Sequence, residues 1–327
     1  MNQPELPERS DVLAAARRIS ARVLTTPVVS RASLNEALGF EIFFKCENQQ
    51  RTGSFKFRGA TNAVARLVEA GVAGPGAVIA THSSGNHAAA LALAAKNRGI
   101  ACYIAMPRTA PGNKKEAVQS YGGRITFCEP TLQSREDTLI RIIESTGATF
   151  IHPYDNFNVI CGQGTAAKEL LEEHADLDAV LVPVGGGGIL SGSAIAAKSM
   201  TRGIKVYGCE PARADDASRS FRSGVLLPSM NPDTLADGLL TSLSELTFSI
   251  IRANVDDMIT VSEEEIIHAL RLIWERMKIV VEPSSAVALA AILQQKERFR
   301  GIRAGILLTG GNADLSNLPF PEKQPRD

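Results

Sequence analysis

The chain has 327 residues, of which 44% are hydrophobic, and this length allows two domains with a sizeable core. Its 35 basic and 35 acidic side chains cancel to a net charge of zero, which gives no reason to expect a nucleic acid or an anionic membrane as a partner. No apolar stretch approaches the roughly 20 residues that are needed to span a bilayer.

Short apolar runs alternate with helix-like segments along the whole chain. This alternation is typical of parallel sheets covered by helices, so we predict an α/β protein with twisted, mostly parallel sheets. The expected strands are 41–45, 77–80, 101–105, 124–128, 149–152, 179–182, 205–209 and 304–308. The expected helices include 10–23, 60–70, 88–97, 114–120, 134–145, 164–173, 193–199, 263–275 and 284–294.

A lysine between two phenylalanines, Lys56, lies after the first predicted strand. Flanking aromatic side chains desolvate an ammonium group and so lower its pKa. A neutral amine is what a lysine needs to form a Schiff base with an aldehyde. The Phe-Lys-Phe pattern alone favours an ordinary strand-end lysine with its head in solvent, so a reactive Lys56 depends on the motifs that follow.

The segment Ser83-Ser84-Gly85-Asn86-His87 joins the predicted strand 77–80 to a helix of small residues. Such a junction brings hydroxyls and backbone N–H groups to a helix N-terminus, which suits a carboxylate ligand. A simple helix cap is the structural alternative, but one capping residue would suffice for it. Four consecutive polar or glycine residues therefore favour a ligand site.

Four consecutive glycines, 185–188, lie between the predicted strand 179–182 and the predicted helix 193–199. This run lets backbone N–H groups surround an anion at the positive end of a helix dipole. No Gly-Lys-Ser/Thr follows, and the glycine spacing does not fit a dinucleotide fingerprint. The strongly apolar neighbours argue against a flexible linker.

The last predicted strand, 304–308, runs into Thr309-Gly310-Gly311-Asn312, which would also fit a simple terminal turn. In this order and spacing, however, the four motifs resemble the fold-type II pyridoxal-phosphate enzymes, and most closely the serine racemase and serine/threonine dehydratase branch. The resemblance extends from about residue 22 to residue 319. It implies a tryptophan synthase β-like fold and a homodimer. It also implies a small substrate-loop domain at 52–147, inserted into a large cofactor-binding domain at 1–51 and 148–327.

The resemblance also implies roles for single residues. Lys56 would carry pyridoxal 5′-phosphate, Phe55 would pack against its ring, and Asn86 would bond its phenolic oxygen. Thr309 would face the pyridine nitrogen. The cofactor phosphate would be held by Gly185, Gly186, Gly187 and Gly188. The substrate would be bound by Ser83, Ser84, Gly85 and His87, with Ser84 on the cofactor face opposite Lys56.

A predicted cation site follows the strand 205–209, in the segment Glu210-Pro211-Ala212-Arg213-Ala214-Asp215-Asp216. The resemblance to serine racemase-like members implies a divalent cation held by the carboxylates of Glu210 and Asp216 and by the carbonyl of Ala214. Hard oxygen ligands suit Mg²⁺, or in its place Ca²⁺ or Mn²⁺. An exposed acidic turn is the alternative.

A further set of stretches is most similar to bacterial 3-hydroxyaspartate dehydratases, and Arg135 lies in one of them. A guanidinium can make a bidentate pair with a second carboxylate, which serine and threonine lack. A surface arginine paired with Glu136 or Asp137 is the alternative. The similar stretches are 128–130, 134–136, 214–216, 219–221, 236–240 and 274–286.

The predicted function is therefore a β-elimination from 3-hydroxy amino acids that yields a 2-oxo acid and ammonia, with 3-hydroxyaspartate favoured over threonine and serine. Lys56 would act as the catalytic base. A second base at Ser84 would permit racemisation, so a serine racemase, alone or as a second activity, is the alternative. A silent binding protein and a β-replacement enzyme such as a cysteine synthase are further alternatives. The intact Lys56 argues against the first, and the predicted cation site together with Glu282-Pro283 argues against the second.

Both chain ends and the cysteines bear on the compartment and on regulation. Residues 1–11 are polar and acidic, without the apolar core of a signal peptide. The chain ends soon after the Thr309 motif, so we expect no regulatory domain and no inhibition by isoleucine. The cysteines form no Cys-x-x-Cys pair and predict buried thiols in a cytoplasmic protein. They are Cys46, Cys102, Cys128, Cys161 and Cys209.

Overall fold

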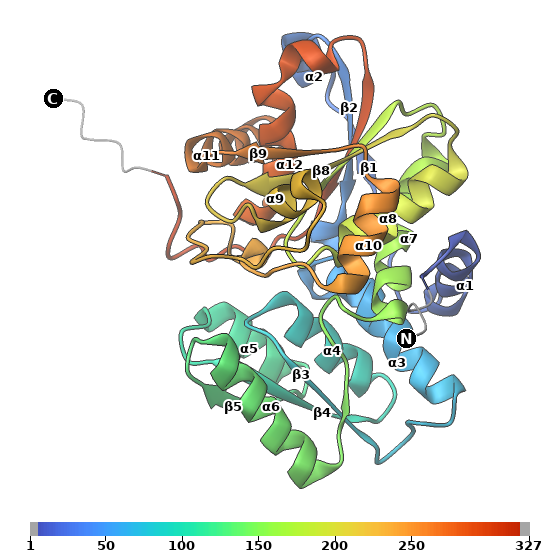
Figure 1. The fold of residues 1–327 in the computed structure, drawn as a ribbon, viewed down its shortest axis with the longest axis vertical. Coiled ribbons are helices and arrows are strands. Elements are labelled where there is room, and N and C mark those ends of the chain that lie inside the picture. The colour runs from blue at the N-terminus through green and yellow to red at the C-terminus, as the bar shows by residue number, and fades with distance from the viewer. Residues whose placement is uncertain (1–5, 321–327) are drawn as a thin grey trace, which may run out of the picture.

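The computed structural model describes residues 6–320, and within this range the predicted fold class is confirmed: two sheets are flanked by helices (Figure 1). The larger sheet has the strand order β1-β2-β10-β7-β8-β9, in which β1 pairs antiparallel with β2 and the other pairs are parallel. Its strands are β1 (Val28–Val29), β2 (Glu41–Cys46), β10 (Arg303–Leu308), β7 (Ala179–Pro183), β8 (Lys205–Pro211) and β9 (Asp257–Val261). The smaller sheet is parallel throughout, in the order β5-β4-β3-β6. Its strands are β5 (Arg124–Cys128), β4 (Ala101–Pro107), β3 (Val78–His82) and β6 (Thr149–Phe150).

Helices surround both sheets, and α3 extends from the larger body alongside the smaller one (Figure 1). The α-helices are α1 (Arg9–Ile19), α2 (Ala32–Leu38), α3 (Lys56–Glu69), α4 (Asn86–Lys96), α5 (Gly112–Ser120), α6 (Leu132–Thr146), α7 (Phe157–Glu173), α8 (Gly188–Met200), α9 (Asp216–Ser223), α10 (Glu245–Asn254), α11 (Glu263–Leu272) and α12 (Pro283–Gln294). Short 3₁₀ segments are η1 (Glu47–Gln49), η2 (Arg51–Gly53), η3 (Asp237–Leu239) and η5 (Lys296–Phe299), and η4 (Ile273–Met277) is a π-helix.

The parallel strands bring the predicted motifs to common sheet edges. Strand β7 is buried along its whole length, as expected for a continuous apolar run in the middle of a parallel sheet. Because β2, β7 and β10 run in one direction, their carboxyl ends lie at one edge of the sheet, where open α/β sheets bind their ligands. The glycine run follows β7, and Thr309 follows β10. Ser83 follows β3 in the same way, in the smaller sheet.

The two phenylalanines beside Lys56 belong to two different hydrophobic cores. Phe57 is fully buried in the core of the smaller sheet, with Ile79 and Ile104 among its members. Phe55 lies in a core of the larger body that includes Val182. Lys56 is therefore located where the two bodies meet.

Several predicted boundaries differ from the structure. Helices α3, α7 and α8 begin earlier than expected, at Lys56, Phe157 and Gly188. The first turn of α8 begins at a glycine and is fully buried, and the first half of α7 contains Gly162 and Gly164 in a fully buried stretch, so neither helix propensity nor an amphipathic pattern marks these two helix starts. Strand β6 is shorter than expected but pairs with β3, beyond the predicted domain boundary at residue 147. The elements β1, β9, α2, α9 and α10 were not predicted.

Within residues 6–320, no helix is both long and apolar enough to cross a membrane. All five cysteines are buried and free. Residues 1–5 and 321–327, which include both ends of the predicted large domain and part of the polar N-terminal segment, lie outside the described residues.

Candidate active site

A cavity with an empty volume of about 1020 Å³ lies between the two bodies and is lined by residues from both. Every residue predicted to bind the cofactor or the substrate lines it, whereas the predicted cation ligands lie elsewhere. The predicted lining residues are Phe55, Lys56, Ser83, Ser84, Gly85, Asn86, His87, Arg135, Gly185, Gly186, Gly187, Gly188 and Thr309. The structure thus gathers four motifs that are far apart in sequence.

Lys56 is the first residue of α3, and its amine lies in this cavity. The Lys56 Nζ donates a hydrogen bond to the carbonyl of Pro153 at 3.2 Å and lies 5.1 Å from the centre of the Phe55 ring. Burial lowers the pKa of the Lys56 ammonium to about 8, against an opposing effect of the Glu282 carboxylate. Compared with an ordinary lysine, this raises the neutral fraction at pH 7 by about two orders of magnitude. Phe57 points into the other core, so the burial comes from the tertiary fold and not from both phenylalanines.

The glycine run forms a tight turn between β7 and α8. Gly187 has φ +83°, and a Cβ at Gly186 would lie 2.3 Å from the Tyr154 ring. In the described part of the chain, the buried N–H groups of Gly185, Gly186 and Gly187 donate to no protein acceptor. Buried N–H groups are rarely left without a partner. Their position at the N-terminus of α8 therefore fits an anionic ligand such as a phosphate.

Asn86 and Thr309 are held by hydrogen bonds that the sequence did not reveal. The Asn86 Nδ2 donates to both carboxylate oxygens of Glu282, at 2.8 and 3.1 Å, and its Oδ1 accepts from Asn312 at 2.9 Å. The Thr309 hydroxyl lies 3.1 Å from the hydroxyl of Ser285. Burial raises the pKa of Glu282, and the positive charge of Lys114 counteracts this effect.

Lys114 and Asp237 also line the cavity and were not identified from the sequence. They form an ion pair between α5 and η3 that joins the two bodies. The stem of Lys114 packs over Gly85, where a Cβ would lie 2.4 Å from the Lys114 Cδ. No local pattern could have shown this pair, because 123 residues separate its members.

On the substrate side, Ser84 lines the cavity and His87 is the second residue of α4. Both ring nitrogens of His87 are buried and lack a hydrogen-bond partner among the described residues. Burial, followed by the charge of Lys56, holds the pKa of His87 well below its usual range.

Arg135 extends from α6 into the cavity, and within residues 6–320 its guanidinium forms no ion pair. Its Nε is buried and has no hydrogen-bond partner in that range. The alternative of a surface pair with Glu136 or Asp137 is therefore not seen, and Asp137 instead accepts a hydrogen bond from Gln133 at 2.7 Å. Burial, assisted by the charge of Arg135, lowers the pKa of the nearby His82 to about 4.

The predicted cation ligands lie at the junction of β8 and α9. Glu210 and Asp216 are each 1% exposed, which contradicts the alternative of an exposed acidic turn. Glu210 accepts from the N–H groups of Ala217 and Ser218 at 3.0 and 2.8 Å, and neither carboxylate has a basic partner within residues 6–320. Burial raises the pKa of Asp216 to about 6, and burial together with the charge of Asp216 raises that of Glu210 well above its usual range.

Two buried carboxylates that have no basic partner among the described residues fit an oxygen-liganded divalent ion. No group of three or more His, Cys, Asp or Glu side chains able to hold a metal occurs within residues 6–320. A site here would therefore need the Ala214 carbonyl and water as additional ligands.

The chain is similar over most of its length to several known proteins. A family model described as pyridoxal-phosphate dependent enzyme matches residues 19–310. The chain is 49% identical to the beta-hydroxyaspartate dehydratase of Paracoccus denitrificans, over 96% of this chain and 99% of the relative. It is 47% identical to the L-threo-3-hydroxyaspartate ammonia-lyase of Saccharomyces cerevisiae, over 95% and 94% of the two chains. The crystal structure of serine racemase from Dictyostelium discoideum superposes with a TM-score of 0.88 at 47% identity, over 94% of this chain and 99% of that one.

Proposed function

The chain belongs to the family of pyridoxal-phosphate dependent enzymes, and from this premise we propose that it is an ammonia-lyase that converts 3-hydroxyaspartate into a 2-oxo acid and ammonia. The observation that carries this substrate is the Arg135 guanidinium, which lies in the same cavity as Lys56 without a carboxylate partner within residues 6–320. Two relatives that are named as hydroxyaspartate dehydratase and hydroxyaspartate ammonia-lyase, at 49% and 47% identity, support the same choice.

The residues of the cavity fit pyridoxal 5′-phosphate. The buried N–H groups of Gly185, Gly186 and Gly187, which have no acceptor within residues 6–320, suit its phosphate. The lowered pKa of Lys56 suits its aldehyde. When bound, this cofactor supplies an aldehyde for the Lys56 amine and a ring that accepts electrons from the substrate. We propose that Phe55 packs against the ring, Asn86 bonds its phenolic oxygen and Thr309 faces its pyridine nitrogen.

The protein residues then bind and orient the amino acid. The carboxylate next to the reacting carbon is held at the N-terminus of α4, by Ser83, Ser84, Gly85 and His87. Arg135 holds the second carboxylate as a bidentate pair. His82 does not compete for it, because with a pKa of about 4 this side chain is neutral at pH 7.

Lys56 acts as the base that removes the proton from the α-carbon. Its pKa of about 8 leaves a useful neutral fraction near neutral pH, and at the same time keeps the amine basic enough to accept a proton. Burial of the amine between the two bodies reduces its contact with water. The elimination requires only one base, and Lys56 supplies it.

Serine racemisation is the second candidate function, because Ser84 lines the same cavity. A hydroxyl on the cofactor face opposite Lys56 would exchange the α-proton on that face, and two bases on opposite faces permit inversion. The similarity to a serine racemase structure supports this candidate. The two reactions can share one site.

We further propose that Glu210, Asp216 and the Ala214 carbonyl bind Mg²⁺, or in its place Ca²⁺ or Mn²⁺. The lack of any basic partner for the two buried carboxylates within residues 6–320 supports a cation there. The ion would stabilise the junction of β8 and α9. A homodimer, a cytoplasmic location and a domain division near residues 52 and 147 remain predictions.

The deciding experiment measures the release of 2-oxo acid and ammonia from serine, threonine and each stereoisomer of 3-hydroxyaspartate, with and without a chelator. We expect one 3-hydroxyaspartate stereoisomer to have the highest kcat/KM. A higher kcat/KM for serine or threonine would contradict the proposed substrate. Racemisation of serine without release of ammonia would favour the second candidate.

A further inference from the structure

The Arg58 side chain lies on the side of α3 that faces away from the candidate active site. Successive residues of an α-helix are rotated by about 100°, so residues two apart point in nearly opposite directions. Lys56, the first residue of α3, lines the cavity, whereas Arg58 is fully buried among other elements. The two residues are separated by about 3 Å along the helix axis. A restraint on Arg58 therefore also restrains the backbone of Lys56.

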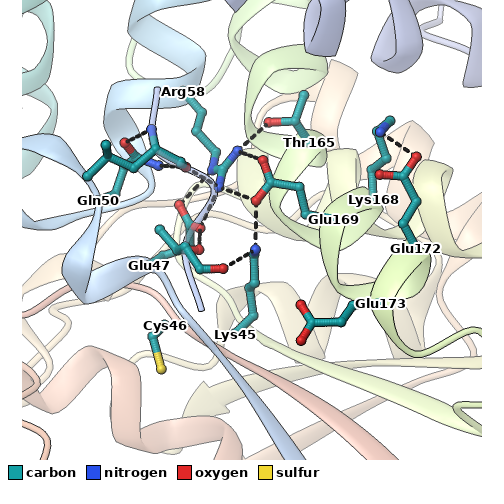
Figure 2. Close-up of polar contacts among 12 residues, drawn as sticks. Lys45, Cys46, Glu47, Gln50, Arg58, Thr165, Lys168, Glu169, Glu172 and Glu173 are labelled. Atoms are coloured by element: carbon teal, nitrogen blue, oxygen red, sulfur yellow. Dashed lines mark hydrogen bonds and ion pairs between the residues drawn. The ribbon is translucent and has the colours of Figure 1, made fainter. Parts of the chain in front are cut away.

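All three nitrogens of the Arg58 guanidinium donate hydrogen bonds, and Figure 2 shows Glu47 and Glu169 on two sides of the group. Nε and Nη2 donate to the two oxygens of Glu47 at 2.7 and 2.8 Å, and Nη1 and Nη2 donate to those of Glu169 at 2.7 and 2.8 Å. Nη1 also donates to the Thr165 hydroxyl at 3.2 Å, and Nη2 to the Leu24 carbonyl at 3.2 Å. The first turn of α3 is thus joined to η1, which follows β2, and to α7.

Lys45 balances the charge of this network. Its Nζ donates to Glu169 at 2.6 Å, as Figure 2 shows, and also to the Thr26 carbonyl at 2.7 Å. The side chains of Lys45, Arg58 and Glu47 are 0% exposed and that of Glu169 is 16% exposed. Two buried cations therefore face two carboxylates. The pKa of Lys56 is shifted by burial and by Glu282, without a contribution from these four groups.

Close backbone packing accompanies the network. A Cβ at Gly59 would lie 2.8 Å from the Val159 carbonyl oxygen, and a Cβ at Gly162 would lie 2.6 Å from the Arg58 carbonyl oxygen. Helices α3 and α7 are therefore in direct backbone contact beside Arg58. Close-packed interiors transmit displacements, so a shift of α7 would move the first turn of α3.

We propose that Arg58, Glu47 and Glu169 are positioning residues for Lys56, which fix the first turn of α3 so that the Lys56 amine stays in its reactive place in the cavity. This role depends on the function proposed for Lys56. A misplacement of about 1 Å at a reacting group can cost on the order of 100-fold in rate. A weakened network should therefore lower kcat while substrate binding is retained.

Glu169→Gln tests this role, since it keeps the shape of the side chain and removes its charge. The matched control is Glu172→Gln, on the same helix, where Glu172 pairs with Lys168 at 2.6 Å outside the Arg58 network. We expect Glu169→Gln to lower kcat by about 10- to 100-fold and to leave the KM for the amino acid within about twofold. Glu172→Gln should behave as the wild type in both parameters.

A second readout uses the cofactor-free protein and separates position from charge. The pH dependence of Lys56 acetylation, followed by mass spectrometry, should have its midpoint at about 8 in the wild type. A displaced amine loses burial, so in Glu169→Gln the midpoint should rise toward about 10.4. A purely electrostatic role would lower the midpoint, because Arg58 and Lys45 would then outweigh Glu47. A lowered or unchanged midpoint overturns the proposal.

Thr165 provides a charge-neutral variant in case Glu169→Gln fails to fold. Thr165→Val removes the hydroxyl that accepts from Arg58 and should shift kcat and the midpoint in the same directions, whereas Thr165→Ser should restore both. If Thr165→Val, like Thr165→Ser, keeps the kcat and the acetylation midpoint of the wild type, the proposal is wrong. A borohydride-reduced holoenzyme that carries the cofactor on another lysine would refute the function of Lys56 itself, and the positioning role with it. If the reduced cofactor is found on Lys56 but the Glu169 and Thr165 variants keep the wild-type kcat and acetylation midpoint, only the positioning role is refuted.

Discussion

Replacement of Arg135 by alanine should damage the turnover of 3-hydroxyaspartate far more than that of serine. The Arg135 guanidinium has no carboxylate partner within residues 6–320, and its Nε is buried without a hydrogen bond, so a substrate carboxylate would be its first strong partner. Loss of a buried charged partner costs roughly 2–5 kcal/mol. Because Arg135 is only half-buried, we expect the lower part of this range, about 2–3 kcal/mol, or about 30- to 150-fold in kcat/KM.

The assay compares kcat/KM for the preferred 3-hydroxyaspartate stereoisomer and for L-serine in the wild type, in Arg135→Ala and in Arg141→Ala. Arg141 lies on the same helix α6 but is exposed and does not line the cavity, so it controls for the loss of a cation from α6. The selective loss should occur with Arg135→Ala only. Equal losses for both substrates would refute the assignment of a second carboxylate to Arg135.

Three further predictions concern the proposed base Lys56, the hydroxyl of Ser84 on the opposite face of the cofactor, and the proposed cation site at Glu210 and Asp216. The rate at which the cofactor-free protein takes up pyridoxal 5′-phosphate should rise with pH through about 8, because only the neutral Lys56 amine reacts. Absorbance near the visible edge measures this rate, and a rate that does not change with pH would contradict the lowered pKa. Ser84→Ala should abolish any serine racemisation measured by chiral chromatography and should retain elimination, so loss of both activities would rule out an opposite-face role. A chelator should lower the melting temperature more at pH 8 than at pH 5. Without a cation, burial raises the folded pKa of Asp216 to about 6, above its usual value near 3.9, so stability that is present below about pH 4 is lost as the pH rises through about 6. The total loss is up to about 3 kcal/mol, and roughly half of it occurs between pH 5 and pH 8. A melting temperature that is insensitive to chelator at both pH values would contradict the proposed site.

The sequence was sufficient for the fold class and for the motifs that line the cavity. Alternating apolar runs predict parallel strands because side-chain burial follows local periodicity. The polar and glycine-rich turns after the strands 77–80, 179–182 and 304–308 predict ligand loops because such turns present hydroxyls and backbone N–H groups at the ends of strands and the starts of helices. These are local patterns, and family resemblance supplied their roles.

Contacts between distant segments could not be predicted in the same way. The bonds from Asn86 to Glu282 and from Lys114 to Asp237 join residues 196 and 123 positions apart. Arg58 stands two residues after Lys56, yet its partner Glu169 lies 111 positions away. Which side chains meet across such distances depends on the path of the whole chain.

The pKa of Lys56 shows most clearly which properties the sequence determined and which the tertiary structure decided. Its place between two phenylalanines suggested a desolvated amine, but only the tertiary structure shows that Phe55 and Phe57 enter separate cores and that burial between the two bodies lowers the pKa to about 8. The residue types and their order determined which groups are present for catalysis. The packing of the two bodies decided their distances, partners and charges, because solvent exclusion and electrostatic interactions act between groups that only the folded chain brings together.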